Sequence, residues 1–494
     1  MTRRANFGIG VVRYIRPSQR RSAGHVIPAI PICRAALALS FLFSTCAFAG
    51  SALPDTPAGT LLQAWIDAFD SGDETRIREF DEAHSPEMKP LEETMAWRDQ
   101  TGGFTLLSVE KSEPLSITAL LREKDSEWAA RVTLSLRPDD ASKIAKLVFA
   151  GMPVPREYAQ ARMTEPEALA ALSAHVDGLA HKDFFSGSVL IARHGKILLQ
   201  RAWGFADREA KTPNTIETQF RIGSMNKMFT AIATLQLVEA GKLALDEPVG
   251  TYLPDYPNKD IAAKVTVRHL LTHTGGTGDI FGPEFDANRA TLKEHADYLK
   301  LYGTRGPDQV PGTEFEYSNY GFVLLGALIE KVTGRSYYDY VRDKIFAPAG
   351  MHATDSLPES VAVPMRAKGY MRVHRAWVSN VDTLPYRGTA AGGGYSTVGD
   401  LLRFAGALES GKLLSKTLFA EATRSQKGPY GFGFIVDGDG ASRMYGHDGG
   451  APGINGSLRI FPTSGYVLIA LSNLDPPAAD RPLGYFEVRM PLNR

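Results

Sequence analysis

The first third of the chain changes from helical to strand-like periodicity. Apolar residues recur at helical spacing in LLQAWIDAF (61–69), and Asp73–Phe80 predicts a second helix after a Ser-Gly break. Helices followed by an antiparallel sheet indicate an α+β domain, which we expect at residues 55–150. The strand-like runs that follow the helices are Phe104–Lys111, Ser116–Glu123, Glu127–Leu136 and Lys143–Phe149.

A second region follows a linker at residues 151–164, where Pro153 and Pro155 resist continuation of a helix or strand. The pattern next predicts a helix over Pro166–His181 and a hairpin that turns at His194–Gly195. From about Leu243 to Asp382 the chain is mostly helical and rich in loops. It then returns to strands at Gly433–Asp437, Ser442–Tyr445, Ile454–Phe461 and Tyr466–Leu471.

Residues 165–494 are therefore expected to form an α/β (α+β) domain. Strands from its two ends would make one antiparallel sheet with helices on both faces, beside an all-helical lobe. The tail after Asn473 leaves little room for a long closing helix, because Pro476, Pro477 and Pro482 interrupt it.

The amino terminus has the features of a targeting segment. Arginine-rich sequence precedes an apolar run from Ala35 to Ala49, which is short for a membrane span. Ala47-Phe48-Ala49 suits cleavage by signal peptidase, so we expect a signal peptide at residues 1–49. The protein would be exported to the periplasm or medium, without stable membrane insertion after cleavage.

Charge and cysteine content limit the classes of partner. The 494 residues include 55 Lys plus Arg and 55 Asp plus Glu. The chain therefore lacks the net positive charge that would favour binding to nucleic acid. Both cysteines, Cys33 and Cys46, lie in the expected signal peptide, so the mature chain would have neither disulfides nor thiol chemistry. Oligomeric state stays open, and a homo-oligomer is compatible with the sequence.

Ser224 and Lys227 are the first candidates for catalysis. They stand three apart at the start of the helical segment SMNKMFTAIATLQLVEAGK, and residues three apart on a helix are neighbours. Lys227 could then take the proton of the Ser224 hydroxyl, which is a poor nucleophile without a nearby base. A Ser and a Lys at this spacing are common, so the pair alone is a weak signal.

Two further motifs make the signal specific. Tyr317-Ser318-Asn319 precedes an apolar helix, and Gly446-His447-Asp448-Gly449-Gly450 lies between strand-like segments. SxxK, YxN and HxG in this order resemble the serine β-lactamase and penicillin-binding-protein superfamily. The similarity is greatest to its class C branch, with family VIII esterases and D-aminopeptidases. It covers about Glu165 to the carboxyl terminus and implies the β-lactamase/transpeptidase-like fold.

The resemblance implies roles for these residues. Ser224 would be the nucleophile, and Lys227 and Tyr317 would share its proton, with the choice of base left open. Asn319 would orient Lys227 or the substrate, and His447 and Gly449 would bind or orient the substrate. The backbone N–H groups of Ser224 and Gly450 would form the oxyanion hole. The family requires no metal or organic cofactor, and we expect none.

His447 departs from the antibiotic-hydrolysing members of this superfamily, which carry Lys-Thr-Gly here. Histidine is mostly neutral at neutral pH, and Asp448 adds a negative charge. Recognition of a β-lactam carboxylate should be weak. We therefore expect an exported serine hydrolase of small-molecule esters, amides or peptides.

Two other functions stay open. One is a β-lactamase or D,D-peptidase, which His447 disfavours. The other is a catalytically silent binding or regulatory protein with the penicillin-binding-protein shape, which the intact motifs disfavour. The domain at 55–150 resembles the nuclear-transport-factor-like cone on pattern alone, and we favour packing or assembly as its role.

Other catalytic motifs are not supported. His269 and His273 stand four apart, but Leu270 occupies the position where a zincin has Glu, so capping and packing are the expected roles. Ile222 and Asn226 replace the glycines of a G-x-S-x-G elbow.

Overall fold

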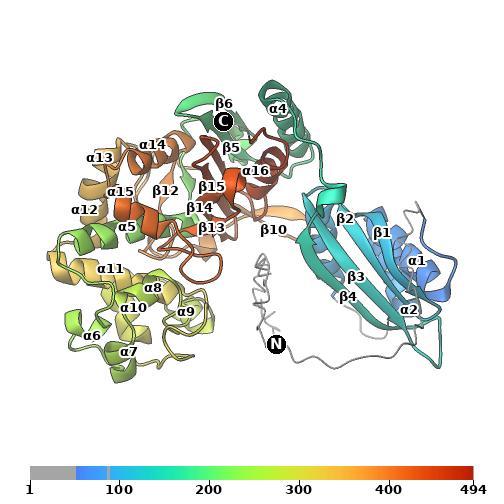
Figure 1. Cartoon of the computed structure of the whole chain (residues 1–494), viewed down its shortest axis with the longest axis horizontal. Coiled ribbons are helices and arrows are strands. Elements are labelled where there is room, and N and C mark those ends of the chain that lie inside the picture. The colour runs from blue at the N-terminus through green and yellow to red at the C-terminus, as the bar shows by residue number, and fades with distance from the viewer. Residues whose placement is uncertain (1–51, 86–89, 493–494) are drawn as a thin grey trace, which may run out of the picture. The chain divides into compact units, whose positions relative to one another are not determined.

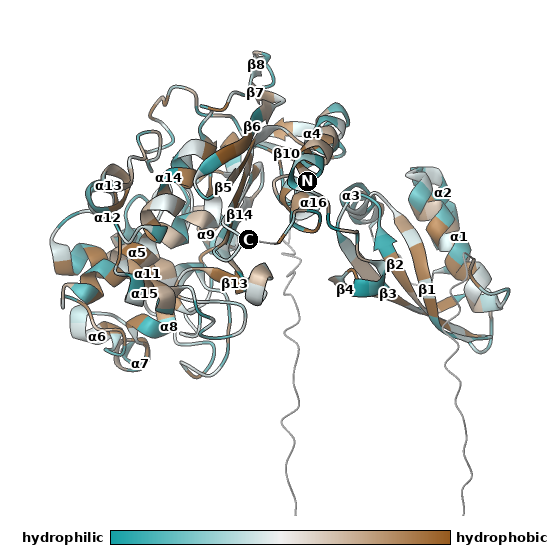
Figure 2. Ribbon diagram, turned by 45° about the horizontal axis from the view of Figure 1, so that its top comes forward, coloured by the Kyte–Doolittle hydropathy of each residue, from teal (hydrophilic) through white to brown (hydrophobic). Residues whose placement is uncertain are grey.

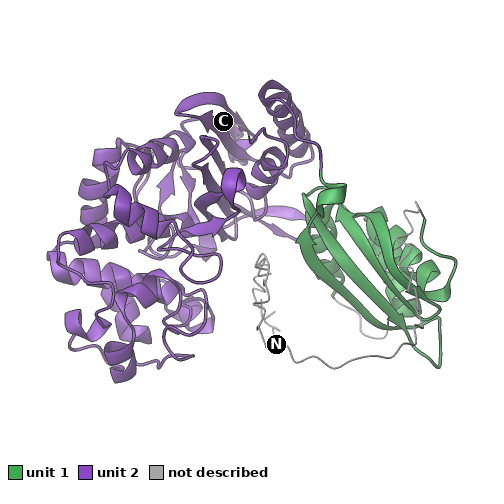
Figure 3. Ribbon diagram, in the orientation of Figure 1, with its two compact units in different colours: residues 1–159 green, residues 160–494 purple. Residues whose placement is uncertain are grey.

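The computed structural model describes residues 52–85 and 90–492, and the chain divides into two compact units, residues 1–159 and 160–494 (Figure 3). The expected signal peptide lies outside the described residues. The fold has mixed α and β structure with antiparallel sheets, as the sequence predicts.

The amino-terminal unit is an antiparallel sheet of four strands in sequential order, with three helices before it in the chain (Figure 1). Thr56 caps the first helix by accepting a hydrogen bond from Gly59 N–H at 3.1 Å, and Gly72 ends that helix in the left-handed region. The elements are α1 (Pro57–Ser71), α2 (Glu74–His84), α3 (Leu91–Thr101), β1 (Phe104–Glu113), β2 (Ser116–Glu123), β3 (Trp128–Leu136) and β4 (Ile144–Pro153).

The core of this unit is aromatic. Trp65 and Phe69 on α1 stack with ring centroids 4.8 Å apart, and Trp97, Phe104 and Phe149 pack around them. The helix α3 was missed in the sequence because polar residues dominate it and it shows almost no apolar periodicity. Strand β4 extends to Pro153, into the segment that the sequence assigns to the linker.

The second unit contains one six-stranded antiparallel sheet in the order β13, β14, β15, β16, β5, β6. It confirms the prediction that the two ends of this region share a sheet, because β16 pairs with β5, Leu468 facing Ile191. The strands are β5 (Gly187–Arg193), β6 (Lys196–Trp203), β13 (Ile435–Asp437), β14 (Met444–Ala451), β15 (Ile454–Phe461) and β16 (Tyr466–Ser472).

Alternate residues of the central strands face two separate cores. On β16, Val467 and Ile469 join one apolar cluster while Leu468 and Ala470 join the other. The second cluster includes α4 (Glu165–His181) and α16 (Asp480–Glu487), and the first includes α5 (Asn226–Glu239) and α14 (Val398–Glu409). Figure 2 shows mainly hydrophobic colouring along β5, as expected for a strand covered on both faces.

The remaining elements of this unit are mostly short helices, many of them in the predicted helical lobe (Figure 1). The helices are α6 (Val249–Tyr252), α7 (Lys259–Lys264), α8 (Val267–Leu271), α9 (Pro283–Asn288), α10 (His295–Tyr302), α11 (Asn319–Thr333), α12 (Tyr337–Val341), α13 (Ala347–Ala349) and α15 (Lys416–Ala422). The short strands are β7 (Phe205–Asp207), β8 (Thr212–Pro213), β9 (Phe220–Arg221), β10 (Tyr370–Val373), β11 (Ala376–Ser379) and β12 (Tyr395–Ser396).

One local prediction needs correction. The sequence places Gly446–Gly450 between strands, whereas the whole segment belongs to β14, because backbone pairing with β15 overrides the low strand propensity of glycine. The tail forms a closing helix of only eight residues, α16, which agrees with the expectation that a long helix does not fit there. Pro482 fits within its first turn, where no intrahelical N–H bond is lost.

Truncating a side chain in the second core should destabilise this unit strongly. Leu468 is fully buried, so Leu468→Ala should cost about 2–5 kcal/mol through lost burial and a residual cavity. Ile197, which is 46% exposed on β6, offers a control expected to change stability by less than about 1 kcal/mol when replaced by Ala. Urea unfolding followed by circular dichroism would measure both midpoints, and equal shifts would contradict this assignment of the core.

Candidate active site

Ser224 lies in a single 3-10 turn, Gly223–Met225, directly before α5. Gly223 has a φ of 53°, which favours glycine, and a Cβ there would lie 3.1 Å from Gly450 N. A Cβ on Gly449 would lie only 1.9 Å from the carbonyl oxygen of Ile222. The glycines therefore allow β14 to lie against the backbone that presents Ser224.

Lys227 is fully buried on the first turn of α5, and its Nζ lies 3.1 Å from Ser224 Oγ. The amine also donates to Asn319 Oδ1 at 2.7 Å and to the carbonyl oxygen of Ala391. A neutral amine has two N–H donors and one lone pair. With both donors directed at these carbonyl oxygens, the lone pair is available to the Ser224 hydroxyl.

Burial lowers the pKa of Lys227 to about 7, because the interior disfavours the ammonium form. The negative charge of Asp279 acts in the opposite direction and raises this pKa. A substantial fraction of Lys227 is thus neutral near pH 7, which a base for Ser224 requires.

Tyr317 lies beside this amine, with Lys227 Nζ 4.7 Å from its ring centroid. Burial raises the pKa of Tyr317 above that of an ordinary phenol, although its hydrogen bond with Ser224 lowers the pKa in part. Tyr317 consequently keeps its proton at neutral pH and can donate it toward the serine oxygen.

Ser318 fixes the Tyr-Ser-Asn motif at the start of α11. Its Oγ accepts a hydrogen bond from Gly321 N–H at 2.9 Å and so caps the helix. Its own N–H donates to Nδ1 of the buried His273 at 3.0 Å. These contacts hold the residues on either side, Tyr317 and Asn319, next to Lys227.

Asp279 is a site residue that sequence reasoning missed. Asn319 Nδ2 donates to Asp279 Oδ1 at 2.9 Å, while Asn319 Oδ1 accepts from Lys227. Because a carboxylate only accepts, Asp279 fixes which side of the Asn319 amide faces Lys227. In the sequence, Asp279 is notable only because it follows closely after the HTGG segment. It lies 40 residues before Asn319, so no local pattern relates the two residues.

His447 is buried on β14 in a neutral form. Burial lowers its pKa well below the ordinary value, and the positive charge of Lys227 lowers it further. His447 Nδ1 lies 2.6 Å from the carbonyl oxygen of Asp448 and therefore carries the proton. Nε2 must then accept from Tyr430 Oη at 2.8 Å, a second partner that the sequence did not indicate.

The backbone beside Ser224 lies close to that of Gly450, as the expected oxyanion hole would require. The close approach of Gly223 to Gly450 N brings the N–H-bearing backbone of both segments together. Gly450 is exposed at this point of β14, and Ser224 is partly exposed, so a substrate carbonyl can reach them.

His269 and His273, the pair four residues apart in the sequence, take part in capping and packing. His269 caps α8, because Thr266 N–H donates to its Nδ1 at 3.3 Å and Thr266 Oγ1 accepts from His269 N–H. His273 packs against Tyr317 with ring centroids 4.2 Å apart. Within residues 52–85 and 90–492 no group of His, Cys, Asp or Glu is arranged to hold a metal.

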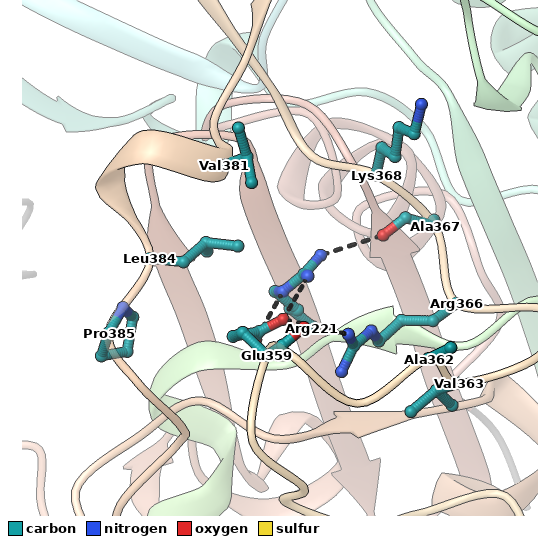
Figure 4. A pocket seen from close by; sticks show the side chains of 10 residues that line it. All are labelled: Arg221, Glu359, Ala362, Val363, Arg366, Ala367, Lys368, Val381, Leu384 and Pro385. Carbon is teal, nitrogen blue, oxygen red and sulfur yellow. Dashed lines mark hydrogen bonds and ion pairs between the residues drawn. The ribbon is translucent and has the colours of Figure 1, made fainter. Parts of the chain in front are cut away.

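A separate pocket of about 360 Å³ contains none of these residues (Figure 4). In it, Arg221 donates two hydrogen bonds to Glu359, at 3.0 and 2.6 Å, and Arg366 contacts the same carboxylate. Lys368, which also lines the pocket, is paired with Asp207 and Glu209 outside it, and we assign no function to this pocket.

Comparison with known proteins agrees with this geometry. The sequence profile of the Beta-lactamase family matches residues 169–489. The chain is also similar to the crystal structure of a penicillin binding protein from Bacillus halodurans. The two share 32% identity with a TM-score of 0.57, over 62% of this chain and 96% of that chain.

Two curated relatives carry names of enzymes. Esterase EstB of Burkholderia gladioli is 34% identical over 218 residues, which cover 40% of this chain and 55% of that protein. A D-aminopeptidase of Brucella suis is 30% identical over 281 residues, which cover 54% of this chain and 52% of that protein. In the described part of the chain, no helix has the length and apolar character needed to cross a membrane.

The reactivity of Ser224 should follow the ionisation of Lys227. As pH rises through about 7, Lys227 loses its proton and becomes able to accept one, so reaction with a fluorophosphonate should accelerate and then level off. The rate of labelling, measured by intact mass from pH 5 to 9, tests this expectation. Lys227→Ala should label at least about 100-fold more slowly throughout, and a flat profile for the parent protein would contradict the assignment.

Proposed function

Since the chain belongs to the Beta-lactamase family of serine hydrolases, we propose that it cleaves carboxylic esters or small amides and peptides through an acyl-enzyme on Ser224. The observation that carries this proposal is the 3.1 Å approach of Ser224 Oγ to a buried Lys227 amine whose pKa is lowered to about 7. The names of the related esterase and D-aminopeptidase support the two substrate classes.

In the first step, Ser224 Oγ attacks the substrate carbonyl while its proton passes to neutral Lys227. The pKa of Lys227 is lowered and that of Tyr317 is raised. Lys227 is therefore the better proton acceptor, because a phenol with a raised pKa is already protonated. The oxyanion that forms would be stabilised by the backbone N–H groups of Ser224 and Gly450.

Collapse of this intermediate releases the alcohol or amine. Tyr317 is hydrogen-bonded to Ser224 and can donate its proton to the leaving group, with Lys227 replacing that proton. A water molecule then attacks the acyl-enzyme with Lys227 again as base, which regenerates the free serine. Asn319 keeps the Lys227 amine directed at Ser224 through both steps.

The neutral state of His447 favours esters and amides over β-lactams. A β-lactam carries a carboxylate, and an ammonium at position 447 would attract it. Here a buried imidazole bonded to Tyr430 and to the Asp448 carbonyl provides no such charge. A β-lactamase or D,D-peptidase activity is the second candidate, supported by the related penicillin binding protein.

We also propose that the protein is exported and that the unit formed by residues 55–150 serves packing or assembly. The arginine-rich start, the apolar run and Ala47-Phe48-Ala49 support export. The aromatic core of Trp65, Phe69 and their neighbours supports a self-contained domain.

Replacing the nucleophile tests the acyl-enzyme. Ser224→Ala should abolish covalent labelling by a fluorophosphonate and lower ester hydrolysis by at least about 1,000-fold, because the remaining groups cannot form the covalent intermediate. Intact mass and turnover of short-chain p-nitrophenyl esters would be measured, with the circular dichroism spectrum as a control for folding. A labelled variant, or a parent that never labels, would contradict the proposal and favour a catalytically silent binding protein.

Replacing His447 tests the charge argument. His447→Lys should increase the rate of acylation by a penicillin about tenfold, since an ammonium would face the β-lactam carboxylate. His447→Gln is the matched control, because it changes the side chain without adding charge. Equal rates in both variants, measured by mass spectrometry of the penicilloyl adduct, would show that other contacts decide β-lactam recognition.

A further inference from the structure

Asn455 on β15 lies opposite Gly450 in the central sheet and is only 2% exposed. Its Nδ2 donates to the carbonyl oxygen of Gly449 at 2.9 Å. The N–H of Gly450, which the oxyanion hole would use, belongs to the same peptide group as that carbonyl. A buried side chain is thus bonded to the peptide group that would bind the oxyanion.

A planar trans peptide couples the directions of its two polar groups, because its C=O and N–H point to opposite sides of the chain. The carbonyl of Gly449 is directed at Asn455 on β15, so the N–H of Gly450 must point away from β15. Gly223, next to Ser224, approaches the same nitrogen, since a Cβ there would lie 3.1 Å from Gly450 N. The contact made by Asn455 therefore fixes the direction of an N–H beside the nucleophile.

Glycine at positions 449 and 450 gives this part of β14 a need for restraint. Both residues have wide conformational freedom, and rotation of their shared peptide would turn the N–H aside. Pairing of β14 with β13 involves residues 444–446, so it ends before this peptide. The preceding peptide is also restrained by a side chain, because His447 Nδ1 donates to the carbonyl oxygen of Asp448 at 2.6 Å.

The amide of Asn455 is itself held by the segment that leads into α16. Its Oδ1 accepts from Ala479 N–H at 2.6 Å, and its Nδ2 also contacts Asp480 Oδ2 at 3.4 Å. Because a backbone N–H can only donate, Ala479 determines which end of the amide faces Gly449. The start of the closing helix thus sets the orientation of Asn455, and Asn455 sets that of the peptide.

We propose that Asn455 is a positioning residue for the oxyanion hole, which directs the Gly450 N–H at the developing oxyanion and ties it to the closing helix α16. This inference rests on the proposed acyl-enzyme on Ser224. Asn455 is buried and acts through the peptide that joins Gly449 to Gly450 rather than by contact with the substrate. Without it, sheet pairing alone holds that peptide, and the N–H is less well directed.

Replacing the phosphoryl oxygen of a fluorophosphonate with sulfur isolates this effect. When Ser224 attacks the probe, the phosphoryl oxygen takes up negative charge that the oxyanion hole would stabilise through hydrogen bonds. Sulfur accepts hydrogen bonds weakly, so the thiono probe gains little from a well-directed N–H. A poorly directed N–H should therefore slow the oxygen probe much more than the thiono probe, whereas a general disturbance of the site would slow both equally.

The experiment measures the rate constant of labelling for both probes by intact mass from pH 5 to 9. Asn455→Ala should slow the oxygen probe about tenfold to 100-fold and the thiono probe by less than about threefold. The midpoint of the pH profile should stay near pH 7, because Lys227 remains buried. Asn473→Ala is the matched control and should leave the ratio of the two rates unchanged. Asn473 is also buried, but its amide donates to the carbonyl oxygens of Phe205 and Lys368.

Asn455→Leu keeps much of the side-chain volume without the hydrogen bonds and should change the ratio in the same way, which covers the case that Asn455→Ala does not fold. Circular dichroism would report the fold of each variant. Equal slowing of both probes, a shifted pH midpoint, or failure of both variants to fold would assign Asn455 to the structure of the sheet and overturn the proposal. An unchanged rate with the oxygen probe would show that sheet pairing alone directs the Gly450 N–H, and would also overturn it. A parent protein that labels with neither probe would instead contradict the acyl-enzyme on Ser224.

Discussion

The site depends on keeping one amine out of water. Lys227 has no exposed surface, and its few polar partners are carbonyl oxygens and the serine hydroxyl. Burial lowers its pKa to about 7, and the two carbonyl acceptors leave the lone pair for Ser224. Asn319 on α11 and Ala391 in the segment before β12 are thereby tied to the first turn of α5. Three distant parts of the chain are organised around a single nitrogen atom.

The second constraint on the site is the close contact between the backbone of β14 and the turn that carries Ser224. Strand β14 approaches the turn that carries Ser224 so closely that only glycine fits at position 449, and Gly223 needs its left-handed conformation. The sheet thus determines where the nucleophile lies relative to Gly450. Because β14 is paired with β15 from Tyr445 to Ala451, this part of the site is held by the central sheet rather than by a loop.

The sequence predicted the parts of this site that short motifs encode. Ser224 and Lys227 are three positions apart and Tyr317 and Asn319 two, and it is the order of these short motifs along the chain that identified them. The central sheet was predictable from the short, largely apolar runs that became β5, β15 and β16. The partners of these motifs were not predictable, because Asp279 and Tyr430 meet them only through the tertiary fold. Helix α3 was missed since its buried face is too small to produce a periodic pattern.

Because Lys227 is buried, its protonation affects the stability of the fold as well as catalysis. In the unfolded chain this amine has its ordinary pKa of 10.5, and in the folded chain the pKa is about 7. Between these values the unfolded chain holds a proton that the folded chain has released, so the free energy of unfolding increases with pH across this interval. Integrated over the interval, this one group contributes on the order of 5 kcal/mol against the folded state at and below pH 7. The fold thus has lower thermodynamic stability at and below neutral pH, and the same burial leaves part of Lys227 neutral, and able to act as a base, near pH 7.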